Sequence, residues 1–84
     1  MAKTQRVLRN SSNDVRDRLR ELPPSAKLVA WVLDDQGPLT AEQVTDESLL
    51  PRRTVRYALT RLQDADFVSV RNGSQDSPAP IYYL

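Results

Sequence analysis

The residues most able to contact another molecule lie in one stretch, residues 49–62, with the sequence LLPRRTVRYALTRL. From Pro51 onward its apolar residues recur at positions i, i+3, i+4 and i+7, which is the spacing of a single helical face. That apolar face consists of Val55, Ala58, Leu59 and Leu62. The spacing predicts a helix over residues 51–65. Pro51 suits its first turn, because a missing N–H costs nothing there.

The opposite face of this predicted helix is cationic and rich in hydrogen-bond donors. At about 100° per residue it collects Arg53, Arg56, Tyr57 and Thr60, with Arg52 and Arg61 on its flanks. Arginine donates paired hydrogen bonds to guanine edges and its charge attracts phosphate, so such a face suits the major groove of double-stranded DNA. The alternative is a solvated basic face whose arginines pair with Asp64 or Glu47, which contributes about 0–1 kcal/mol.

Two uncharged residues of this helix have open roles. Tyr57 is suited to contact a thymine methyl group or a phosphate, and equally to pack under the segment that follows the helix. Thr54 fits the support of the helix start better than the reading of a base, although its hydroxyl can also bond a phosphate.

A shorter helix is predicted immediately before, over residues 40–48. Thr40 and Gln43 form a Thr-x-x-Gln capping box at its start. The next two residues are leucines, and Leu50 is biased toward an extended backbone by the proline after it. Two helices joined by a tight apolar turn, the second longer and basic, have the helix-turn-helix layout.

Two further helices are predicted on the N-terminal side, after a flexible N-terminus at residues 1–10. The first, residues 12–22, is amphipathic and ends at a proline pair; it is too short to be stable alone, so its apolar stripe must dock on something. The second, residues 25–36, has Ser25 as its predicted cap and ends at Gly37. Arg16, Arg18 and Arg20 of the first helix are a second candidate phosphate patch. They alternate with acidic residues, so a solvated face is the simpler interpretation.

The tryptophan of the second helix is expected outside the main core. Leu28, Val29, Val32 and Leu33 cluster on one face of that helix, and Trp31 lies roughly 130° from the middle of the cluster. Trp31 therefore either covers the N-terminal helix, which we favour, or meets a partner chain. The possible dimer or helix-packing contacts are Val15, Leu19, Leu22 and Trp31, and we expect a homodimer through this region.

The C-terminal part of the chain changes from helical to β periodicity. Residues 67–71 and 81–84 are β-prone, and the intervening NGSQDSPAP consists of turn and breaker residues. A strand, a polar loop and a strand after a helix-turn-helix make a wing, over residues 67–84. The predicted fold is α+β, mainly α: a winged helix-turn-helix with a three-helix core, a C-terminal β-hairpin wing and an extra N-terminal helix, in one domain over residues 11–84.

The composition narrows the classes of function. The 84 residues contain no cysteine and no histidine, which removes disulfides, thiolate zinc sites and the usual residues of acid–base catalysis. We therefore expect no enzyme activity and no cofactor or metal. No run approaches about 20 apolar residues and no apolar signal region opens the chain, so we expect a cytoplasmic protein.

The formal net charge is only +1, but the charge is unevenly distributed. Residues 1–24 carry six basic and three acidic side chains, residues 25–50 carry one and five, and residues 51–72 carry five and two. Two basic blocks therefore flank an acidic one, and the local field matters more for a nucleic-acid partner than the total charge.

The runs LPPSAKLVAWVL and GPLTAEQVTDESLLPRRTVRYALTRLQDADFV closely resemble winged helix-turn-helix regulators of the MarR-like type, especially short archaeal ones. The resemblance covers roughly residues 22–84. It follows an order of Leu-Thr cap, Leu-Pro turn, Thr-Val-x-x-Ala-Leu helix and hydrophobic strand. It implies that the helix from Pro51 is the recognition helix and that residues 72–80 are the wing tip. The positions that such proteins use against DNA are then Arg52, Arg53, Thr54, Arg56 and Tyr57.

Two features depart from that family. Full-length MarR proteins carry additional long helices for dimerisation, with an effector pocket between them, and this chain has no C-terminal helix; a dimer would have to use the N-terminal helix or Trp31. The wing also lacks the basic residues often found there, because it has only Arg71 near its base and Asp76 near its tip. The candidate DNA-contacting set is Arg52, Arg53, Thr54, Arg56, Tyr57, Thr60, Arg61 and Arg71.

The leading hypothesis is a sequence-specific double-stranded DNA-binding transcription regulator with its recognition helix in the major groove. In that case phosphate contacts supply most of the affinity and arginines the specificity. The alternative is a winged-helix protein–protein interaction module of a transcription or other nucleic-acid assembly, which the acidic middle block and the neutral wing favour slightly. RNA binding lacks support, because no exposed aromatic stacking platform is evident.

Overall fold

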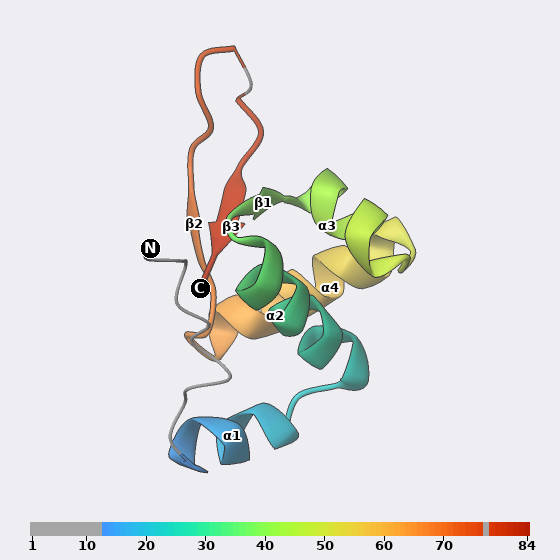
Figure 1. Cartoon of the computed structure of the whole chain (residues 1–84), viewed down its shortest axis with the longest axis vertical. Coiled ribbons are helices and arrows are strands. Elements are labelled where there is room, and N and C mark those ends of the chain that lie inside the picture. Colours follow the sequence, from blue (N-terminus) through green and yellow to red (C-terminus); the bar gives the residue numbers. More distant parts are fainter. Residues whose placement is uncertain (1–12, 77) are drawn as a thin grey trace.

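The computed structural model describes residues 13–76 and 78–84 and has a winged helix-turn-helix fold (Figure 1). The elements in chain order are α1 (Asn13–Arg20), α2 (Pro24–Gln36), β1 (Leu39–Thr40), α3 (Ala41–Ser48), α4 (Arg52–Asp64), β2 (Ser69–Arg71) and β3 (Ile81–Tyr83). Figure 1 shows α2 lying over α4, with α3 beside one end of both. The β2–β3 hairpin and α1 lie toward opposite ends of the molecule. The predicted flexible segment at residues 1–10 lies outside the described residues.

The core is formed mainly between α2 and α4. The predicted apolar stripe of α4 is confirmed, because Val55, Ala58, Leu59 and Leu62 are all buried. The stripe of α2 is different from the prediction. Its buried hydrophobic residues are Ala26, Val29, Ala30 and Leu33. Leu28, expected in the core, is 41% exposed. The buried face of α2 includes Ala26 and Ala30, so it is rotated around the helix axis by about one residue from the predicted face.

Helix α1 docks on the C-terminal end of α4. Leu19 and Leu22 join the core at 8% and 7% exposure. Arg18 donates a hydrogen bond from Nη2 to the backbone carbonyl of Ala65 at 2.7 Å, and its guanidinium lies 4.8 Å from the centroid of the Phe67 ring. Ala65 caps α4, so Arg18 satisfies one of the carbonyls that a helix end leaves unpaired. The side chain of Val15 lies outside the described part of α1.

Three helix starts were predicted, and one is confirmed in full; at α4, Pro51 is the N-cap instead of a first-turn residue, and the helix spans Arg52–Asp64. In α3, Gln43 N donates to Thr40 Oγ1 at 3.1 Å and Thr40 N donates to Gln43 Oε1 at 2.9 Å, which confirms the capping box. The predicted Ser25 cap of α2 is wrong. Pro23 is the N-cap, without a side-chain hydrogen bond, and Pro24 begins the helix, because proline already has a helical φ and no N–H to satisfy.

Both helices of the helix-turn-helix are followed by a residue with left-handed backbone. Leu49, which follows α3, has φ +63° and is 88% exposed; its N–H donates to Thr45 O at 3.0 Å and ends the helix. Asp66, after α4, also has φ +63°. The N–H groups of Phe67 and Val68 then donate to Leu62 O at 2.9 and 3.3 Å, so the predicted strand begins only at Ser69.

The wing is part of a three-stranded antiparallel sheet in the order β1-β3-β2. On one side of β3, Leu39 pairs with Tyr82 and Thr40 with Ile81. On the other side, Val70 of β2 also pairs with Tyr82. The sequence predicted only a brief extended connector at Leu39, so the pairing of this segment with the wing is an addition. It fixes the base of the hairpin to the start of α3.

Candidate nucleic-acid interface

The exposed face of α4 carries the residues that the sequence predicted as DNA contacts. Because the buried stripe faces α2, the opposite side of the helix is turned to solvent. Its exposed residues are Arg52, Arg53, Arg56, Tyr57 and Thr60, while Thr54 and Arg61 are half-buried. The geometry thus brings together seven of the eight predicted residues on one helix, and Arg71 lies on β2.

Three arginines of this face make no hydrogen bond or ion pair with any described residue. They are Arg52, Arg53 and Arg56, and the pairing with Asp64 or Glu47 is not formed. The first turn of α4 contains no acidic residue, so the partial positive charge of the helix N-terminus adds to that of the arginines. These guanidinium groups therefore retain all their donors for an external acceptor.

The fourth arginine of the helix has a different environment. Arg61 donates from Nη1 to the Tyr57 hydroxyl at 2.9 Å, and its guanidinium lies 5.8 Å from the centroid of the Tyr57 ring. The pair is one turn apart on the helix surface. Tyr57 is 49% exposed and, because its hydroxyl accepts this bond, its own hydroxyl hydrogen remains available to an acceptor such as a phosphate oxygen. Arg61 therefore orients Tyr57.

A hollow of about 280 Å³ joins the start of α4 to the base of the wing. Its lining residues are Thr40, Ala41, Glu42, Arg52, Arg56, Ala79, Pro80 and Tyr82. The β1–β3 pairing creates it, because this pairing holds the hairpin against the start of α3. Sequence reasoning did not include Tyr82 or Pro80 in the site. The strand that pairs with Tyr82 is only two residues long, Leu39–Thr40, and a segment of that length gives no periodic signal from which a sheet partner could be predicted.

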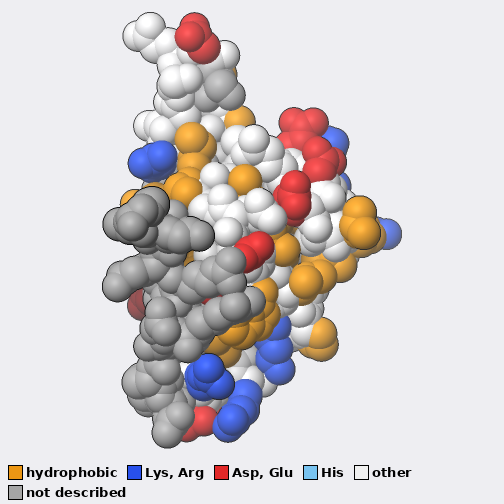
Figure 2. Space-filling model, viewed as in Figure 1, with side chains coloured by type: hydrophobic (Ala, Val, Ile, Leu, Met, Phe, Trp, Pro, Cys, Tyr) orange, Lys and Arg blue, Asp and Glu red, His pale blue; other side chains and the backbone are white. Residues whose placement is uncertain are grey.

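The wing contributes little positive charge. Arg71 is exposed, at the end of β2, and its guanidinium lies 5.7 Å from the centroid of the Tyr83 ring on the adjacent strand. Asp76 belongs to the loop between the strands. On the face that Figure 2 shows, an acidic side chain and no basic one lies at the hairpin tip. Of the helix-turn-helix and the wing, α4 therefore carries most of the exposed positive charge.

The described residues supply neither a metal site nor a membrane span. They contain no group of three or more acidic side chains arranged to hold an ion. None of the helices in this part of the chain combines the length and hydrophobicity that crossing a bilayer requires.

Comparison with known proteins shows a structural similarity. No family model and no curated protein sequence matches the chain. Among solved structures, a MarR family regulator from Neisseria meningitidis superposes with a TM-score of 0.63 and 21% sequence identity. The match covers 86% of this chain and 51% of that one, so the chain spans about half the length of the matched structure. This similarity shows that the two share the winged-helix fold.

Proposed function

We propose that the protein is a double-stranded DNA-binding transcription regulator that inserts α4 into the major groove. The observation that carries the proposal is the exposed arginine face of the second helix of a helix-turn-helix, where Arg52, Arg53 and Arg56 lack acceptors among the described residues. Charged donors without protein partners favour an anionic ligand, and a helix of this size fits the major groove. The structural similarity to a MarR family regulator supports the same class.

Each residue of the face has a proposed role. Arg53 and Arg56 contact guanine edges, because both are exposed: Arg53 lies opposite the buried stripe, and Arg56 lies about 100° from Val55 on the side toward the wing base. Arg52 lies at the helix start beside the wing base and contacts phosphate, as does Thr54 through its hydroxyl. Tyr57, held by Arg61, contacts a phosphate or a thymine methyl group. The remaining proposed contacts are Thr60 and Arg71.

Several finer expectations remain predictions. They are the short archaeal type, the homodimer and the cytoplasmic location, together with specific recognition of one operator sequence. Leu19 and Leu22, which were expected as possible dimer contacts, are buried in the chain's own core. They are therefore helix-packing residues and are not available to a second copy.

A second candidate function is that of a protein-interaction module. The observation in its favour is a surface away from α4 that combines exposed apolar residues, Leu28 and Trp31, with acidic residues on α2 and α3. A wing without a basic tip is consistent with this function as well.

The proposal is tested by selection from a pool of random-sequence duplexes at low salt, followed by fluorescence anisotropy with the selected duplex and a scrambled one. We expect enrichment of a defined motif and an affinity at least tenfold higher for the selected duplex. Absence of binding to the whole pool at low ionic strength would refute the DNA-binding proposal and favour the protein-interaction module. Equal affinity for both duplexes would leave DNA binding but remove the specific readout by Arg53 and Arg56.

A further inference from the structure

The loop of the wing contains a dipeptide with its own chemical reactivity, Asn72-Gly73. The sequence has three asparagines, and Asn72 is the one that a glycine follows. The side-chain amide carbon of an asparagine can close a five-membered ring with the backbone nitrogen of the next residue, and a glycine there has no Cβ to obstruct the approach. Asn72 is therefore a candidate for deamidation, which converts the side-chain amide into a carboxylate.

The strand pairing of the wing stops immediately before this dipeptide. Strand β2 ends at Arg71, which pairs with Ile81 of β3. The same register would next place Asn72 opposite Pro80, and a proline has no N–H with which to extend the ladder. Neither Asn72 nor Gly73 has a positive φ, so the two do not form the tight hairpin turn that this dipeptide favours. They lie instead in the longer loop that projects beyond the helices (Figure 1).

No described residue restrains the two groups that would react. Asn72 is exposed and Gly73 is half-buried. Neither the side-chain amide of Asn72 nor the N–H of Gly73 makes a hydrogen bond with any other residue that the structure describes. Ring closure therefore breaks no hydrogen bond within the described part of the chain.

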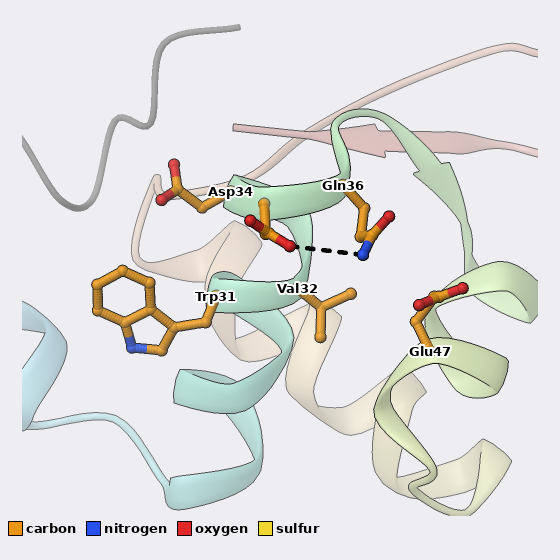
Figure 3. Close-up of a pocket in the computed structure, with 6 residues that line it drawn as sticks. Trp31, Val32, Asp34, Gln36 and Glu47 are labelled. Carbon is orange, nitrogen blue, oxygen red and sulfur yellow. Dashed lines mark hydrogen bonds between the residues drawn. The ribbon is translucent and has the colours of Figure 1, made fainter.

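The chain's other glycine, Gly37, follows a glutamine and is held in place. Its N–H donates to the carbonyl of Leu33 at 3.0 Å and ends α2. Gln36 donates from Nε2 to Oδ2 of Asp35 at 3.5 Å, as the dashed line in Figure 3 marks. A glutamine must also close a six-membered ring, which forms more slowly. Gln36 is therefore an internal control, because it has the same glycine neighbour but both of its reacting groups are hydrogen-bonded.

We propose that Asn72 is a site of spontaneous deamidation. The Gly73 nitrogen gives up its proton to hydroxide and attacks Cγ of Asn72, forming a new C–N bond. The bond from Cγ to the side-chain nitrogen then breaks, and that nitrogen leaves as ammonia after taking a proton from water, which regenerates the hydroxide. Water next opens the five-membered succinimide at either of its two carbonyls and yields an aspartate or an isoaspartate. In total one water is consumed and one ammonia is released, with no oxidant, cofactor or enzyme.

The reaction changes the charge at the base of the wing. Either product carries a carboxylate, which is ionised at neutral pH, so the formal net charge falls by one, from +1 to 0. The new charge lies directly after Arg71, the one basic residue of residues 67–84. The consequence for DNA rests on the proposed function: a carboxylate beside Arg71 offsets the attraction of this arginine for phosphate. Deamidation should therefore lower DNA affinity at low salt and have less effect at high salt.

The modification is tested by incubating the folded protein in heavy-oxygen water, at neutral and at mildly alkaline pH, and mapping its peptides by mass spectrometry. Each deamidation replaces the side-chain nitrogen by an oxygen from the water, so the heavy isotope marks the site. We expect the peptide with residue 72 to take up label at least fivefold faster than peptides with Asn10, Asn13 or Gln36. Uptake should be faster at alkaline pH, because the attacking nitrogen must lose its proton.

Two comparisons separate the role of the dipeptide from that of the fold. Gly73→Ala should slow the labelling of Asn72 at least fivefold, because a Cβ obstructs ring closure. The labelling rate of the folded chain should be less than tenfold below its rate in urea, because the loop leaves both reacting groups without restraint. A folded chain that reacts tenfold or more slowly than the unfolded chain would overturn the proposal. So would labelling of Asn72 that is no faster than that of the other two asparagines.

The effect on DNA is measured by fluorescence anisotropy with the selected duplex at low salt. Asn72→Asp should lower the affinity about twofold to fivefold, whereas Asn72→Gln, which keeps the amide, should bind as the wild type does. Circular dichroism confirms that each variant is folded. Equal affinities of the two variants would overturn the consequence for DNA. If the wild type itself binds no duplex, the DNA-binding function is refuted together with this consequence, while the isotope measurement still decides the modification.

Discussion

The three arginines at the start of α4 and Arg18 on α1 differ in what they contact. On α4, Arg52, Arg53 and Arg56 are exposed and make no hydrogen bond or ion pair with the described residues. By contrast, Arg18 on α1 bonds the Ala65 carbonyl at 2.7 Å and stacks over an aromatic ring. From the sequence alone, α4 and α1 both have basic faces. The contacts distinguish them, because the three α4 arginines are available to a ligand and Arg18 links α1 to the end of α4.

The largest predicted effect is on the group without partners. Replacing Arg53 and Arg56 together by alanine should weaken specific DNA binding by about 1–3 kcal/mol per residue, because each change removes a groove contact. The dependence of log affinity on log salt should also become shallower if these side chains reach phosphates. Fluorescence anisotropy measures both quantities. Thermal unfolding is the control, and a change in stability above about 0.5 kcal/mol would show that these arginines have a structural role.

The second prediction concerns Arg18, which contacts the end of α4. Arg18→Ala should lower the free energy of unfolding by about 1–2 kcal/mol, through loss of a charged hydrogen bond and of the ring contact. For a domain of this size that is a fall in melting temperature of about 4–16 °C. DNA affinity of the folded protein should change less than threefold. A large affinity loss with unchanged stability would move Arg18 into the DNA interface and break the distinction.

The third prediction concerns the base of the wing. Arg71→Ala should reduce DNA affinity by less than about 1 kcal/mol and the salt dependence by one phosphate contact at most, because a single basic residue lies there and it stacks near Tyr83. Anisotropy at several salt concentrations resolves this change. An effect as large as that of the α4 double variant would mean that the wing, not α4, supplies the main contact.

The smallest effect is expected at Arg20. Its Nη1 donates to Asp17 Oδ1 at 2.9 Å, and the two side chains are 75% and 64% exposed. Ion pairs of this kind contribute about 0–0.5 kcal/mol. Arg20→Ala should therefore leave both the unfolding free energy and DNA affinity within experimental error. A measurable loss of affinity, with no loss of stability, would revive the interpretation of α1 as a phosphate patch.

Much of the fold was predictable because its signals are local. The α4 stripe follows from apolar residues at i, i+3, i+4 and i+7, and the Thr40 capping box from two residues three positions apart. The order of helix, turn, helix and wing follows from the breakers between them. Trp31 was also placed correctly outside the core, since its angle around the helix is set by the sequence alone.

The misses depend on partners distant in sequence or on subtle packing. β1 is two residues long and pairs with residues about 40 positions later, so no periodicity reveals it. Leu28 was expected to be buried because it is strongly hydrophobic. The buried face of α2 instead contains the alanines, and residue hydrophobicity alone does not predict that choice. In the site, the residue types were predictable. Which arginines lack partners was not, because the acceptor of Arg18 is a backbone carbonyl 47 residues away.

The central claim is that α4, and not another basic surface, meets DNA. It is tested most directly by nuclear magnetic resonance, with isotope-labelled protein titrated with the selected duplex and the backbone amide shifts followed by residue. We predict that the largest shifts fall in residues 52–60, with smaller ones near Thr40 and Tyr82, and that the Ala65 amide and residues 16–20 change little. Shifts concentrated on α1 or on the outer face of α2, with residues 52–60 unaffected, would contradict the account.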